Sequence, residues 1–98
     1  KQSMAMVTWG ITPSTGVNES KPARISLYGY NKVDWTINIK DASGKLVDSS
    51  TFENEFQFST KWAPEKDLPN GTYTVTVDVV TKDGFKVTTT PKTITVTQ

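Results

Sequence analysis

The acidic side chains are the only candidates for acid–base chemistry in this sequence. The chain has no histidine and no cysteine, so the commonest general base, thiolate nucleophiles and the usual zinc and copper ligands are missing. Glu53 and Glu55 are the best-spaced carboxylate pair, because residues two apart share one face of a strand. Two carboxyl groups about 5–10 Å apart could hydrolyse a glycosidic bond. A charged edge strand that resists aggregation explains the pair equally simply. We favour this second reading, assign no catalytic residue and expect that the protein is not an enzyme.

The remaining acidic residues do not have the spacing of a metal site. Four aspartates lie in or near predicted turns: Asp41, Asp48, Asp67 and Asp83. Calcium needs about six to eight converging oxygen ligands, which sequences supply with spacings such as Asp-x-Asp-x-Asp-Gly. No such spacing occurs, and the hydrogen bonds that aspartate makes in turns explain these positions. We therefore predict no metal site and no cofactor.

Aromatic side chains are the better candidates for binding. The sequence pattern places Trp35 in the core and leaves four other aromatic residues less determined: Trp9, Tyr28, Tyr30 and Trp62. Exposed rings of this kind can stack on sugars or anchor a protein partner. The alternative is that the two tryptophans close the ends of the core and the tyrosines cover sheet edges. Large aromatic residues are highly buried on average, which favours the alternative.

Alternating apolar and polar residues predict the strands that would carry these side chains. The clearest alternation runs over residues 73–79, after a turn at Asn70 and Gly71, and indicates a central strand with one buried face. Further strands are predicted at residues 4–11, 23–28, 33–40, 46–48, 56–62 and 85–97. The last of these changes parity and needs an irregularity near Pro91. About seven short strands without a helix indicate an all-β, antiparallel β-sandwich.

Two aromatic positions give this pattern a family resemblance. Trp35 and Tyr73 stand where immunoglobulin-like sandwiches have a core tryptophan on the third strand and a tyrosine at the start of strand F. The chain therefore resembles a bacterial immunoglobulin-like (Ig/fibronectin III-like) domain. The resemblance implies that Val75 and either Ile25 or Leu27 replace the usual cysteines, so the sandwich has no disulfide.

The same resemblance makes two finer predictions. It implies that the Tyr73 hydroxyl bonds the backbone near Leu68 or Pro69. More specifically, the chain resembles the flagellar hook-capping type of Ig-like module, which is found in secreted and surface proteins. The parts of the chain that carry this finer likeness are residues 12–19, residues 33–47, Trp62 and residues 69–73.

Composition limits the classes of partner. The chain has 98 residues and a formal net charge of +1, with charges scattered singly, so we expect one domain over residues 1–98 and no nucleic-acid binding. No apolar run approaches the roughly 20 residues of a membrane span, and we expect no membrane insertion. The abrupt start at Lys1 is typical of a domain excised from a larger protein.

These observations together predict a non-catalytic accessory module of a bacterial secreted or cell-surface protein. It would act as a spacer, position a neighbouring domain or bind another protein. Its expected partners are the neighbouring domains of the parent protein or another surface protein. The alternative is a carbohydrate-binding module that binds polysaccharide through its exposed aromatic residues. Either role places the chain outside the cell or on its surface.

Overall fold

A computed structural model describes residues 7–98, and this part of the chain folds into six strands without a helix. The strands are β1 (Val7–Thr12), β2 (Ala23–Lys40), β3 (Leu46–Trp62), β4 (Gly71–Val80), β5 (Lys86–Thr88) and β6 (Lys92–Val96). Every ladder between them is antiparallel. The predicted all-β antiparallel fold is therefore confirmed. The described residues contain no helix that could cross a membrane.

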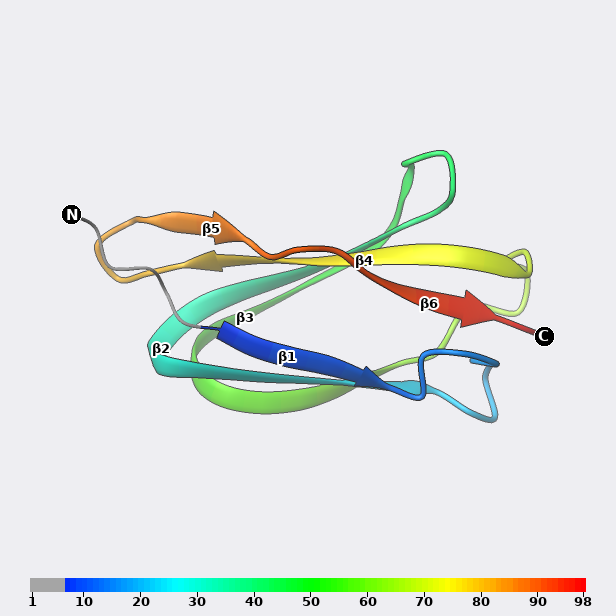
Figure 1. The fold of residues 1–98 in the computed structure, drawn as a ribbon, viewed down its shortest axis with the longest axis horizontal. Coiled ribbons are helices and arrows are strands. Elements are labelled where there is room, and N and C mark those ends of the chain that lie inside the picture. The colour runs from blue at the N-terminus through cyan, green and yellow to red at the C-terminus, as the bar shows by residue number, and fades with distance from the viewer. Residues whose placement is uncertain (1–6) are drawn as a thin grey trace.

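A long ribbon of β2 and β3 produces the two layers. The first half of β2 pairs with β1 and the second half pairs with β4, while β3 pairs with β2 along both halves. The β2–β3 register shifts between Tyr28 and Val33, where the ribbon bends and folds back over itself (Figure 1). One continuous sheet thus curls into a sandwich. β5 and β6 both pair with β4 and complete the second layer.

The length of this ribbon also explains the strand count. The predicted strands at residues 23–28 and 33–40 merge into β2, and those at residues 46–48 and 56–62 merge into β3. The polar stretch between the latter two was wrongly left without a strand. It shows no alternation because β3 pairs only with β2, which leaves most of its side chains exposed. The predicted break near Pro91 is confirmed, since β5 ends at Thr88 and β6 begins at Lys92.

The core lies between the two layers and is centred on Trp35. This side chain is fully buried, and its indole Nε1–H donates to the backbone oxygen of Glu55 at 2.9 Å. The ring of Phe58 meets it edge-on, with ring centroids 5.7 Å apart. Gly29 lies at the bend of β2, where an added Cβ would approach the Trp35 ring to 3.3 Å. The prediction of a core tryptophan is confirmed, and the lack of a side chain at Gly29 leaves space for the indole ring.

The tyrosine predicted at the corner before the central strand is also confirmed. Tyr73 is 4% exposed, and its hydroxyl donates to the backbone oxygen of Pro69 at 2.6 Å. Val75, Ile25 and Leu27 are all buried in the core. Aliphatic packing therefore takes the place of the disulfide found in many related sandwiches.

Aspartate side chains organise the tight turns. In the turn between β2 and β3, the Asp41 carboxylate accepts hydrogen bonds from the Ser43 hydroxyl and from the Ser43 and Lys45 amides, and Gly44 has a φ of 90°. These bonds lower the pKa of Asp41, the Ser43 hydroxyl contributing most.

The first predicted strand, residues 4–11, includes Met4 and Met6, which lie outside the described residues. β1 is described from Val7 onward.

Candidate functional site

The two halves of β3 face each other across one open side of the sandwich. β3 pairs with β2 alone, so each half lies at the edge of its layer. Paired residues in an antiparallel ladder point to the same side of the sheet, and the β2 partners at alternate positions are buried core residues. The inner-face residues are therefore Asp48, Ser50 and Phe52 on the first half of β3, and Phe58, Thr60 and Trp62 on the second half.

Two of the three resulting pairs close the gap between the layers. The rings of Phe52 and Phe58 pack with centroids 4.7 Å apart. At the other end, the Trp62 indole Nε1–H donates to the Asp48 carboxylate at 2.8 Å. The middle pair, Ser50 and Thr60, consists of short polar side chains. These are too small to fill the space that the flanking aromatic residues bridge.

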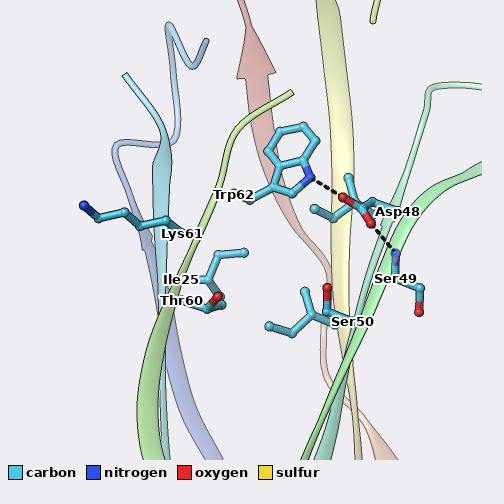
Figure 2. Close-up of a pocket in the computed structure, with 9 residues that line it drawn as sticks. Ile25, Asp48, Ser49, Ser50, Thr60, Lys61 and Trp62 are labelled. Atoms are coloured by element: carbon cyan, nitrogen blue, oxygen red, sulfur yellow. Dashed lines mark hydrogen bonds between the residues drawn. The ribbon is translucent and has the colours of Figure 1, made fainter. Parts of the chain in front are cut away.

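A hollow therefore remains at the middle pair, which we call the β3 hollow (Figure 2). Its cavity volume is about 30 Å³, and it is open to solvent on one side. Its floor consists of three isoleucines that are at most 3% exposed: Ile25, Ile37 and Ile39. Asp48, Ser50, Thr60 and Trp62 form the rim, so an apolar base lies beneath a polar mouth. A hollow of this size has room for one or two water molecules and is far smaller than the roughly 300–1,000 Å³ of most small-molecule sites.

The rim carries a negative charge. One oxygen of the Asp48 carboxylate accepts from Trp62, and the other accepts from the Ser49 amide at 2.8 Å. The Lys61 side chain lines the hollow by its stem but extends away from Asp48 (Figure 2). Among residues 7–98, no three acidic side chains gather closely enough to hold a metal ion. A single carboxylate with two hydroxyl neighbours does not supply the roughly six to eight oxygen ligands that calcium needs.

The hydrogen bond from Trp62 to Asp48 joins the two layers. We expect Trp62→Phe to lower the free energy of unfolding by about 1.5 kcal/mol, because the variant loses a hydrogen bond to a charged acceptor and keeps only part of the ring packing. Urea unfolding followed by circular dichroism measures the change. Tyr28→Phe, at an exposed position, is the control and should change stability little. An unchanged midpoint for Trp62→Phe would show that the layers do not depend on this bond.

The four predicted binding aromatics do not come together. Trp62 packs against the core at the β3 hollow, while Trp9 packs against it from β1, on the opposite side of β2. The Nζ atom of Lys92 lies 5.4 Å from the centroid of the Trp9 ring. Tyr28 is 49% exposed on the outer face, and Tyr30 is 73% exposed at the bend of β2. The four rings therefore do not form one stacking platform.

The polar residues that line the β3 hollow were not among the predicted site residues. Asp48 was predicted at the end of a short strand near a turn, and it lies inside the longer strand β3. Ser50 was assigned to no predicted strand, and Thr60 was given no binding role. A spacing of two residues between inner-face positions, repeated on both halves of β3, is the pattern that would have indicated them. It becomes visible only when residues 46–62 are treated as one strand.

Comparisons with known proteins give a family and a fold. The model of the CopC domain matches residues 10–97. Among solved structures, the CopC protein from Methylosinus trichosporium OB3b matches with a TM-score of 0.64 and 24% identity, over 95% of this chain and 93% of that one. An engineered protein matches with a TM-score of 0.61 and 18% identity, over 95% of this chain and 20% of that one. No curated protein sequence matches.

These findings correct two expectations. The finer likeness to flagellar hook-capping modules is not supported, because the family model that matches is the CopC domain. The expected function, a generic spacer or positioning and interaction module, was wrong for the same reason, and so was the carbohydrate-binding alternative. Both rested on turn and core residues, which determine the fold and leave the ligand open.

Proposed function

Because the chain belongs to the CopC domain family, we propose that it is a non-enzymatic copper-handling domain that works outside the cytoplasm. The match over residues 10–97, nearly the whole chain, is the observation that carries this proposal. Proteins of this family bind copper or confer copper resistance, and they are periplasmic or secreted. Copper would be the cargo of the domain. The sequence-based prediction of a secreted protein is consistent with a location outside the cytoplasm.

The donor atoms of the chain favour Cu(I) over Cu(II). Imidazole is a usual copper ligand, and the chain has no histidine. Thioether sulfur is a soft donor that selects Cu(I), and the chain has two methionines and no cysteine. Met4 and Met6 are separated by one residue in the sequence. We therefore propose that these two thioethers are the Cu(I) ligands. The earlier expectation of no metal site considered histidine, cysteine and carboxylates, and it left the thioethers out.

Competition with bicinchoninate under reducing, anaerobic conditions tests this proposal. The wild-type protein should withdraw Cu(I) from the coloured complex, and the double variant Met4→Leu/Met6→Leu should do so at least tenfold less well, since leucine keeps the volume but lacks sulfur. The matched control is Gln2→Ala/Ser3→Ala, which alters the same segment and should bind as the wild type does.

Each contrary outcome removes a defined part of the proposal. If the wild-type protein withdraws no Cu(I) and binds no Cu(II), the copper function is wrong. If the double methionine variant binds as well as the wild type, the ligand assignment is wrong. Specific Cu(II) binding, detected by electron paramagnetic resonance, would contradict the preference for Cu(I).

A further inference from the structure

We propose that Asn70 and Gly71 form a site of spontaneous covalent modification in the folded protein, and that Gln98 controls its rate. Asn70 lies directly before β4, Gly71 begins that strand, and both residues are exposed. Gly71 has a φ of 152° and no side chain to shield its backbone nitrogen. Apart from its neighbours in the chain, no atom of residues 7–98 lies within 4 Å of the place where its Cβ would stand.

The reaction needs only these two residues and water. The Gly71 nitrogen loses its proton and attacks Cγ of Asn70. A C–N bond forms, the bond from Cγ to the side-chain nitrogen breaks, and ammonia leaves with the proton. Water then opens the resulting cyclic succinimide at either carbonyl, which gives aspartate or, with the main chain routed through Cγ, isoaspartate. Such side-chain chemistry is one reason why asparagine is a thermolabile residue.

In the folded chain, the Asn70 amide is held by the backbone of Gln98. Its Oδ1 accepts from the Gln98 amide N–H at 2.8 Å, and its Nδ2 lies 3.5 Å from the Gln98 carbonyl oxygen. These contacts continue the pairing of β4 with β6 beyond the pair Gly71 and Val96. A side chain fixed in this way turns less freely toward the Gly71 nitrogen. The folded protein should therefore react more slowly than the unfolded chain.

The Gln98 side chain in turn attaches this residue to the loop before β4. Its Nε2 donates to the backbone oxygens of Glu65 at 2.9 Å and Leu68 at 2.8 Å, and lies 3.4 Å from that of Lys66. Exposed hydrogen bonds of this kind open locally without unfolding of the core. How often they open should set the rate at which Asn70 is released and reacts.

The modification should weaken the start of β4. An isoaspartyl linkage lengthens the main chain by a carbon at residue 70. Directly before it lies Pro69, whose backbone oxygen accepts from the Tyr73 hydroxyl. The contact between Asn70 and Gln98 would be lost as well. The protein that carries isoaspartate at residue 70 should therefore have a lower urea midpoint than the unmodified protein.

Mass spectrometry of the full chain tests the proposal. The protein is incubated at 37 °C at pH 7 and pH 9 and then digested. The peptide with Asn70 should gain the mass of replacing NH2 by OH, faster at pH 9 because the attacking nitrogen must lose a proton. Asn70→Gln should stay unmodified. The internal controls, which should also stay unmodified over the same period, are the peptides with the four asparagines that no glycine follows: Asn18, Asn31, Asn38 and Asn54.

The variant Gln98→Ala tests the control of the rate. It removes the side-chain hydrogen bonds to Glu65 and Leu68, and should speed the loss of the Asn70 amide at least threefold. Gln57→Ala is the matched control, because Gln57 is exposed on β3 and pairs with β2, and it should react at the wild-type rate. In 8 M urea, where all of these chains are unfolded, their rates should be equal.

The effect on stability has its own control. Urea midpoints are compared before and after incubation for the wild type and for Asn70→Gln, which keeps every other labile position. Only the wild type should lose stability. An equal loss in both proteins would overturn the predicted weakening of β4.

The remaining outcomes address the site and its control separately. Loss of the Asn70 amide in urea but not in the folded protein would overturn the site in the folded molecule. Equal rates for the folded wild type and Gln98→Ala would overturn the role of Gln98. None of these measurements involves copper, so the proposed function stands or falls separately.

Discussion

Replacing Trp35 with alanine should lower the free energy of unfolding by about 3–5 kcal/mol, because it removes the largest fully buried side chain. The side chain is fully buried at the bend of the β2–β3 ribbon. The substitution would leave a cavity between the layers and would remove the donor that now satisfies the backbone oxygen of Glu55. A domain of this size is stabilised by only about 5–15 kcal/mol in total. The variant should therefore be only marginally folded at 25 °C.

Thermal and urea unfolding followed by circular dichroism would measure this loss. We expect the Tm to fall by at least about 12 °C. Trp9→Ala is the control, because Trp9 is only partly buried at the edge strand β1, and it should cost about 1–2 kcal/mol. Trp35→Phe should fall between the two. A smaller loss for Trp35→Ala than for Trp9→Ala would show that the core is not centred on residue 35.

Replacing Tyr73 with phenylalanine should also lower stability strongly, and it should change how stability depends on pH. The variant loses the hydroxyl that donates to Pro69 at 2.6 Å, and leaves that backbone oxygen without its partner. We expect a loss of about 1–3 kcal/mol at neutral pH. The rest of the ring keeps its packing, including its contact with Trp62 at a centroid distance of 6.5 Å.

The pH dependence follows from the pKa of the same hydroxyl. Burial, and to a lesser extent the negative charge of Asp41, raise the pKa of Tyr73 above its usual value of 10.0. The folded protein therefore holds this proton more tightly than the unfolded chain does. The corresponding stabilisation is complete below pH 10 and is lost as the pH rises through the folded-state pKa.

Urea midpoints measured between pH 8 and pH 11.5 would test this. The wild-type midpoint should fall at the alkaline end, and Tyr73→Phe should show a shallower fall. Tyr28→Phe is the matched control: its hydroxyl belongs to an exposed ring, and the alkaline fall of the wild type should persist. Identical slopes for wild type and Tyr73→Phe would mean that another group governs the alkaline transition.

The core could be predicted from the sequence because its signals are local. The alternation around Val75 and Val77 specifies a strand with one buried face, and the tyrosine before it specifies the corner. The break before β6 was predicted because the parity of the last strand changes across Pro91. These features depend on neighbouring residues alone, and all of them are present in the structure.

The β3 hollow could not be predicted because it depends on pairs of residues far apart in the sequence. Asp48 meets Trp62 only when β3 bends with the folded ribbon, and Ser50 and Thr60 line one hollow for the same reason. An edge strand with most side chains exposed shows little alternation, so its continuity is hidden. The function was missed for a different reason: a sandwich fold hosts many unrelated functions, and its core residues carry no information about the ligand.

The continuous pairing of β2 with β3 also favours one order in which the strands of this sandwich pair during folding. Lys40 and Leu46 pair across the tight turn, six residues apart, whereas Ala23 and Trp62 at the far end are 39 residues apart. Closing the long loop directly costs about 1.7 kcal/mol more chain entropy than closing the short one. Pairing that starts at the turn avoids this cost, because each further pair of residues forms next to a pair that is already hydrogen-bonded. In this order of events the two layers meet last, after β2 and β3 have paired. The ribbon then bends at Gly29, and Trp62 reaches Asp48.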